Sequence, residues 1–77
     1  MTEFEKLKNS YISSVQAGML LGIDYNGCRR AIDVLHKIYE NLIDNSNCVD
    51  IDKTVLKYEL KLIKEALLRE AECYYRQ

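Results

Sequence analysis

The sequence predicts a small all-α domain, and three observations carry that prediction. The 77 residues include three glycines and no proline, so few residues interrupt a helix. Apolar residues recur every three or four positions along three stretches of the chain, which is the spacing of amphipathic helices. The length fits one domain, residues 1–77, built from three or four helices with a helical hairpin and a long C-terminal helix.

Composition and charge exclude several classes of protein. Apolar residues make up 48% of the chain and charged residues 30%, a balance typical of a folded globular domain. The formal net charge of −1 excludes the overall basic field of many nucleic-acid-binding proteins, so any DNA contact must be local. The longest apolar runs fall far short of the roughly 18 residues that a membrane-spanning helix needs. We therefore expect no membrane partner.

The first stretch, residues 2–21, is compatible with one helix or two. Thr2 and Glu5 have the spacing of a capping box, which predicts a helix from residue 3. The residues from Asn9 to Ser14 include weak helix formers, so a break near Ser10–Ser14 is an equal alternative. The apolar residues that would share one face of a single helix are Phe4, Leu7, Tyr11, Val15 and Met19.

A tight turn and a second helix are expected next. Gly22 can adopt the left-handed conformation that ends a helix, and Asp24 can cap the helix that follows. That helix is predicted from its alternating steps of three and four residues, and it should end at the polar run 44–47. Its stripe comprises Tyr25, Cys28, Ile32, Leu35, Tyr39 and Leu42.

The last helix is predicted from Lys53 to about Tyr75, after a short loop over Cys48–Asp52, with Asp52 as its N-cap. Two apolar lines run along it and together exceed the roughly 100° arc of a simple surface helix. The main line is Leu56, Leu60, Ile63, Leu67, Ala71 and Tyr74, and the second is Val55, Leu62, Ala66, Leu68 and Tyr75. This surplus predicts self-association, with a dimer interface centred on Leu56, Leu60, Ile63, Leu67 and Tyr74.

Signatures of catalysis, cofactor binding and metal binding are lacking. The chain has one histidine and none of the usual phosphate-loop, nucleophile-elbow or calcium-loop motifs, so we expect no enzyme, cofactor or small-molecule substrate. His36 lies at the flank of the second stripe, where it is expected as a boundary residue. Cys28 and Cys73 are predicted as small buried residues and Cys48 as an exposed thiol, without a zinc site. Three cysteines without a CxxC pair favour a reduced cytoplasm.

The segment from Ser14 to Asp33, which reads SVQAGMLLGIDYNGCRRAID, resembles the helix-turn-helix of excisionase-like and MerR-like DNA-binding proteins. The resemblance rests on a small residue at Gly18, apolar residues before the turn, and Gly22 within it. In that family the second helix enters the major groove of DNA. The resemblance therefore implies DNA contacts from Tyr25, Asn26, Arg29 and Arg30.

Two functions are consistent with these patterns. The first is a small, dimeric helix-turn-helix protein that binds double-stranded DNA as a regulator or as an accessory factor in recombination or replication. The second is a helical interaction module that serves as an accessory subunit or inhibitor of a larger intracellular enzyme, without DNA contact. The near-neutral charge and the surplus apolar area favour the second function. The small size is typical of proteins from phages and mobile elements.

Overall fold

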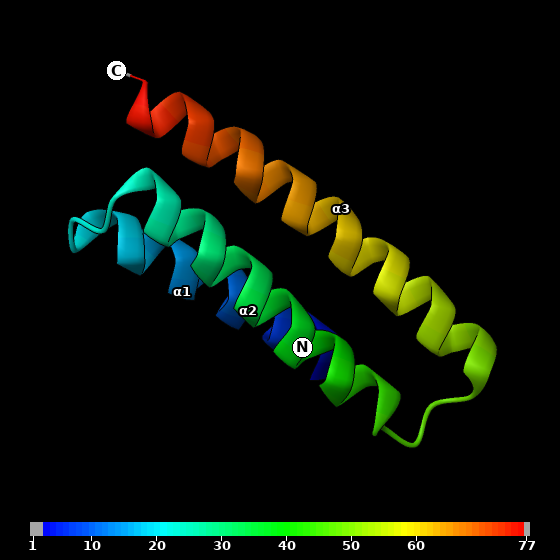
Figure 1. Ribbon diagram of the computed structural model, residues 1–77. Helices are drawn as coiled ribbons and strands as arrows, with labels where there is room; N and C mark the ends of the chain where they lie inside the picture. Colours follow the sequence, from blue (N-terminus) through cyan, green and yellow to red (C-terminus); the bar gives the residue numbers. More distant parts are fainter. Residues whose placement is uncertain (1–2, 77) are drawn as a thin grey trace.

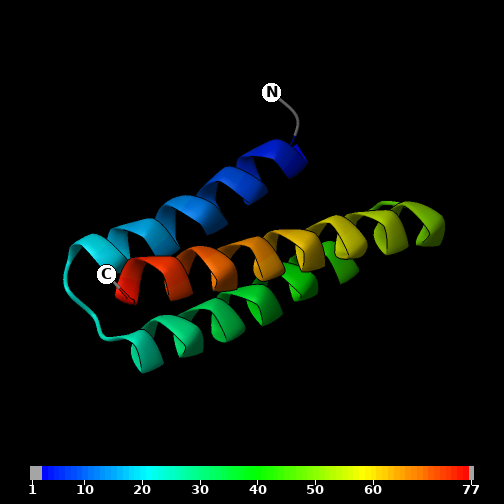
Figure 2. The ribbon, with the colours of Figure 1, turned by 90° about the horizontal axis from the view of Figure 1, so that it is seen from above.

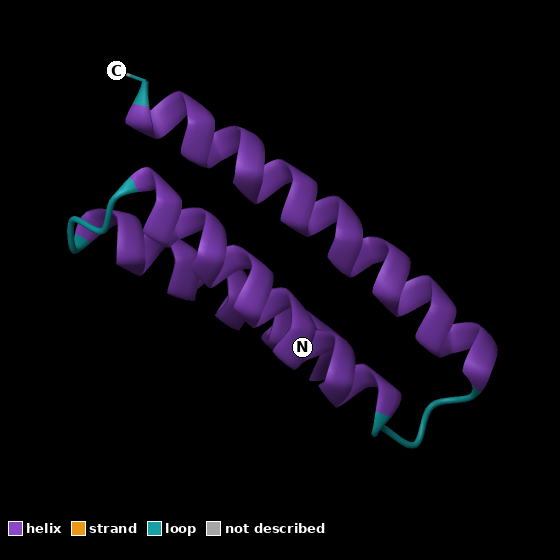
Figure 3. Cartoon of the chain, in the orientation of Figure 1, coloured by secondary structure: helices purple, strands orange, loops and turns teal. Residues whose placement is uncertain are grey.

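A computed structural model describes residues 3–76, which form three helices (Figures 1 and 3). They are α1 (Glu3–Leu20), α2 (Tyr25–Asp44) and α3 (Asp50–Tyr75). The described residues contain no strand, so the all-α prediction is confirmed. Thr2, half of the predicted capping box, lies outside the described residues.

Helix α1 is continuous, which decides between the two alternatives left open by residues 2–21. Its polar residues from Asn9 to Ser14 are weak helix formers, but Tyr11 and Val15 on the opposite face are buried against the other helices. Because packing of an apolar face contributes more to a short helix than intrinsic propensity does, α1 persists through Ser13 and Ser14.

The turn between α1 and α2 has the predicted chemistry. Gly22 has a φ of +89°, the left-handed conformation that glycine adopts without strain. The Asp24 carboxylate accepts a hydrogen bond of 2.6 Å from the backbone N–H of Gly27, which confirms it as the N-cap of α2. A Cβ atom at Gly18 would stand 3.1 Å from the Ile23 side chain, so glycine permits this close approach.

Helix α3 begins earlier than predicted. It starts at Asp50 after Val49, and no side chain caps its first N–H groups. Asp50 and Asp52 instead lie in the first turn, where their negative charge interacts favourably with the positive end of the helix dipole. The prediction of Asp52 as an N-cap and of a loop over Cys48–Asp52 is therefore wrong, because the helix extends past Asp52 toward the loop.

The helices form a rod of 42 × 19 × 18 Å. Helices α2 and α3 are antiparallel and are joined by ion pairs, Asp33 with Lys64 at 2.9 Å and Asp44 with Lys57. The hydrogen bond and charge of Lys64 hold the pKa of Asp33 below its usual value. Helix α1 lies against both, and it diverges from them toward its N-terminus (Figure 2).

The rod therefore has two different ends. The turn end holds the α1–α2 turn and the C-terminus of α3, and the loop end holds the α2–α3 loop (Figure 1).

The core runs along the line where the three helices meet. Its buried members are Tyr11, Val15, Met19, Cys28, Ile32, Ile43, Leu60, Leu67 and Ala71. Tyr11 is fully buried, its ring stacks on Tyr39 with centroids 5.4 Å apart, and its hydroxyl donates to the Ile32 carbonyl at 3.1 Å. The predicted core positions of Tyr11, Tyr25 and Tyr39 are thus confirmed, since the latter two pack against this core.

The cysteines separate into one buried and two exposed thiols. Cys28 is buried in the core, and burial raises the pKa of its thiol. Cys48 is exposed, as predicted. Cys73 is also exposed, so the prediction that it is buried is wrong. It follows the buried Ala71 by two positions, and two helical steps of about 100° turn it away from the core.

His36 occupies the predicted boundary position, with only 11% of its side chain exposed. Its Nε2 lies 3.4 Å from a Glu40 carboxylate oxygen, while its Nδ1 is buried and has no hydrogen-bond partner among the described residues. Burial lowers the pKa of His36 and the charge of Lys64 lowers it further, against the opposing charges of Glu40 and Asp33.

A pH dependence of stability follows from this environment. The pKa of His36 is lower in the folded chain than the value near 6.5 of the unfolded chain, so the unfolded state binds more protons as the pH falls through 6.5. We expect the free energy of unfolding to fall as the pH drops from about 7 to 5. Urea unfolding at both pH values measures this fall. Because the chain has one histidine, the variant His36→Gln should show a much smaller fall in the free energy of unfolding. An equal fall in the wild type and in this variant would contradict the prediction.

Candidate functional site

The four residues predicted to contact DNA lie at the turn end but do not form one uniform surface. Asn26 and Arg30 are exposed on α2 and, with Arg29 and Asp33, line a shallow hollow. Tyr25 is half-buried, edge-on to Tyr75 with centroids 5.8 Å apart. The Arg29 guanidinium lies 5.8 Å from the centre of the Tyr25 ring.

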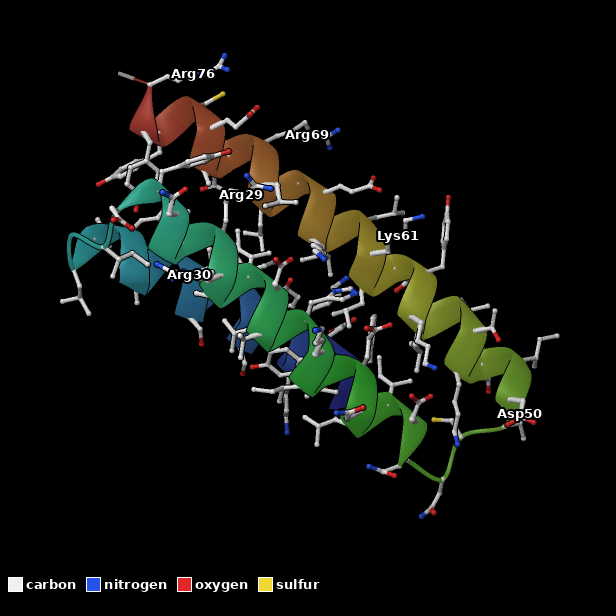
Figure 4. The ribbon with its side chains drawn as sticks, viewed as in Figure 1. Arg29, Arg30, Asp50, Lys61, Arg69 and Arg76 are labelled. Atoms are coloured by element: carbon white, nitrogen blue, oxygen red, sulfur yellow. The ribbon has the colours of Figure 1, made fainter. Side chains whose placement is uncertain are left out.

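Helix α3 brings further arginines to the same end. Because α2 and α3 are antiparallel, Arg69 lines a hollow with Arg29, and Arg76 follows near the C-terminal end of α3 (Figure 4). The four arginines of the chain thus lie in the half of the rod that holds the turn end. Sequence reasoning missed Arg69 and Arg76, because their proximity depends on how the helices pair.

Acidic side chains interrupt this arginine cluster. Glu72 lines hollows with Arg29, Arg69 and Arg76, and Asp33 lines the hollow beside Arg30. The N-terminus of α2, which could otherwise receive a phosphate, is already capped by the Asp24 carboxylate. The turn end is therefore rich in arginine without a continuous basic surface.

The α1–α2 pair is a helical hairpin in which α1 stays in contact with α2 well beyond the turn. Tyr11 of α1 contacts Ile32 and Tyr39 midway along α2. Phe4, at the start of α1, lines a small pocket together with Ile43, which lies near the C-terminal end of α2. DNA-binding helix-turn-helix units cross at roughly 90–120° instead. Helix α3 packs along a second side of α2, so α2 has fewer open faces that could contact DNA.

The stripe predicted as a dimer interface lies within a single chain. Leu60 and Leu67 are buried in the core, and Leu56 and Ile63 pack against it. Tyr74 is 45% exposed and donates its hydroxyl to the Met19 carbonyl at 3.4 Å. The structure thus corrects the expected seam, because the chain itself buries Leu60 and Leu67 and packs Leu56 and Ile63 against its core, and of the five residues Tyr74 stays exposed.

A different face of α3 is apolar and open. Its exposed side chains follow steps of four, three and four residues, and they are Ile51, Val55, Tyr58 and Leu62. We call this set the outer stripe. Its residues lie about half a turn from the core positions Leu60 and Leu67, so they point away from the other two helices. Val55 and Leu62 belong to the second predicted line, whereas Ile51 and Tyr58 were missed.

Two further surfaces are apolar. Leu20 and Leu21 are 81% and 85% exposed at the turn end. We call this pair the tip. At the loop end, α1 diverges from α2 and α3 and leaves an apolar slot of about 100 Å³. The slot is lined by Phe4, Leu7, Leu42, Ile43, Ser46, Cys48 and Leu56.

Other kinds of site find no support within residues 3–76. These residues contain no group of three or more His, Cys, Asp or Glu side chains that could hold a metal ion. None of the three described helices combines the length and hydrophobicity needed to cross a membrane. No family model matches the sequence, and no match was found among curated proteins or solved structures. Function must therefore be inferred from the surfaces of this chain itself.

Proposed function

We propose that this protein is a helical protein–protein interaction module, an accessory chain that holds a larger protein through the outer stripe of α3. The observation that carries the proposal is the exposure of four large apolar side chains on one face of a helix whose other face is the core. The exposed fractions of Ile51, Val55, Tyr58 and Leu62 range from 46% to 73%. A contiguous apolar patch of this kind is typical of interaction surfaces.

The spacing suggests how the partner binds. Positions 51, 55, 58 and 62 are the i, i+4, i+7 and i+11 anchors of a helix that lies in an apolar groove. Asp52, Glu59 and Lys61 flank the stripe and would form a polar rim. Tyr58 would be its main anchor, because tyrosine is enriched among the residues that dominate binding energy.

Site-specific photo-crosslinking in the native host tests the proposal. A benzoylphenylalanine in place of Tyr58 should form an adduct larger than two copies of the chain. The same group in place of Lys37, which is exposed on α2, is the matched control and should form none. Adding Leu62→Glu should reduce the Tyr58 adduct at least tenfold while the helical circular dichroism signal stays unchanged. No adduct from position 58, or an adduct of two copies only, would contradict the accessory role.

DNA binding through the arginine cluster is a second candidate. It is favoured by the hollow that Asn26, Arg29 and Arg30 share and by the nearby Arg69 and Arg76. Gel-shift measurements at low salt test it with the double variant Arg29→Ala and Arg30→Ala. If the double variant no longer binds the duplex and its circular dichroism is unchanged, the result would support this candidate. A DNA duplex that the wild-type protein does not shift would refute it.

A further inference from the structure

The two borders of the outer stripe carry different charges. Asp52 and Glu59 lie on one border, about two helical turns apart, and both are exposed. The other border carries Lys61, which is also exposed. Neither carboxylate forms an ion pair within residues 3–76, although the same helix contains four lysines. The acidic border is therefore available to a charged group outside the chain.

The lysines of α3 do not neutralise this border, because three of the four are engaged on the side of α2. Lys53 donates a hydrogen bond of 2.8 Å to the backbone carbonyl of Asp44. Lys57 pairs with the carboxylate of Asp44, and Lys64 pairs with that of Asp33 at 2.9 Å. Helix α3 thus uses its lysines within the chain and leaves its acidic border without a counter-charge.

The acidic border faces the side of α1, but α1 leaves it open. Glu70, about three turns beyond Glu59 on the same border, accepts a hydrogen bond of 3.4 Å from Gln16 of α1. Toward the loop end α1 diverges from α3 (Figure 2), and the ammonium group of Lys8 lies over the Phe4 ring, 5.6 Å from its centre. The two unpaired carboxylates are thus exposed beside the outer stripe, where α1 has turned away from α3.

From this asymmetry we propose that the partner's apolar groove has one basic wall, with lysine or arginine side chains opposite Asp52 and Glu59. The inference rests on the proposed function, because it assigns the chemistry of the groove that the outer stripe enters. The basic groups would lie about 10 Å apart, since the two carboxylates are about two helical turns apart. Complementary charges at the edge of an interface accelerate association and exclude partners of the wrong charge.

The outer stripe of a second copy does not supply such a wall. Two outer stripes packed antiparallel about a twofold axis would place their acidic borders against each other. Asp52 and Glu59 of one copy would then face the same carboxylates of the other, and like charges oppose pairing. Charge therefore favours a different protein over a second outer stripe.

Charge reversal on the acidic border tests the proposal, with the crosslink from position 58 in the native host as the readout. Glu59→Lys should reduce the yield of the adduct about tenfold, and the neutral variant Glu59→Gln should reduce it less. The matched control is Glu72→Lys, because Glu72 is an exposed glutamate of the same helix without an ion pair among the described residues. This control should leave the yield unchanged, and circular dichroism establishes that each variant is folded.

Salt dependence is a second readout. In a lysate of the same cells, the adduct of the chain with an intact border should decrease as sodium chloride rises from about 0.05 to 0.5 M, and Glu59→Gln should show a smaller decrease.

The two proposals fail in different ways. If the chain with an intact border forms no adduct from position 58, the accessory role is contradicted, and the basic wall with it. If the adduct forms and Glu59→Lys leaves its yield unchanged, the accessory role stands and the basic wall is overturned. Equal losses for Glu59→Lys and Glu72→Lys would also overturn the basic wall.

Discussion

Replacing Leu67 with alanine is expected to lower the free energy of unfolding by about 2–5 kcal/mol, because the side chain is buried where α3 meets α1 and α2. A domain of this size has a total stability of roughly 3–5 kcal/mol, so a large part of the Leu67→Ala population should be unfolded at 25 °C. Urea unfolding followed by circular dichroism measures the loss.

The matched control is Leu62→Ala, the same substitution five positions earlier on the same helix. Leu62 is 46% exposed on the outer stripe, so we expect a change within about 0.5 kcal/mol. In dilute solution the unfolding midpoints should not depend on protein concentration, because Leu67 is buried within one chain. Equal losses for the two variants, or a midpoint for Leu67→Ala that rises with concentration, would contradict this account of the core.

Replacing Tyr11 with alanine is expected to cost about 3–5 kcal/mol and to release α1 from the other helices. Tyr11 is fully buried, its ring stacks on Tyr39, and its hydroxyl donates to the Ile32 carbonyl. Hydrogen exchange of the α1 amides, resolved by residue, measures the release.

The variant Tyr11→Phe separates the ring from the hydroxyl. It keeps the ring contacts and loses one hydrogen bond, so we expect a cost of about 1 kcal/mol. Exchange of the α1 amides should then stay close to that of the wild type. A Phe variant as unstable as the Ala variant would show that the hydroxyl, rather than the ring, holds α1 in place.

Local features of the fold follow directly from the sequence, because they depend on neighbouring residues. The sequence predicts a left-handed conformation at Gly22, an N-cap at Asp24 and an apolar stripe that includes Cys28 and Ile32. The structure contains the first two and buries both stripe residues. The predicted start of α3 lies too far along the sequence, because Asp52 suits both an N-cap and a first-turn position. Only the packing of the helix decides between these two positions.

The surfaces were harder to predict, because they depend on which helix covers which face. Periodicity shows that α3 has two apolar lines, but it does not state which line meets α1 and α2. Leu60 and Leu67 were therefore assigned to a second chain, although the chain buries them itself. Arg69 joins Arg29 only through the antiparallel pairing of α2 with α3, which no local pattern encodes.

The central claim is that α3 has two apolar faces, one in the core and one open for a partner. Solvent paramagnetic relaxation enhancement of the methyl groups, measured by NMR on the dilute chain with a soluble paramagnetic agent, tests it most directly. The methyl groups of Ile51, Val55 and Leu62 should relax strongly, and those of Ile32, Leu60 and Leu67 weakly. Protected methyls at Val55 and Leu62, or accessible ones at Leu60 and Leu67, would contradict the claim.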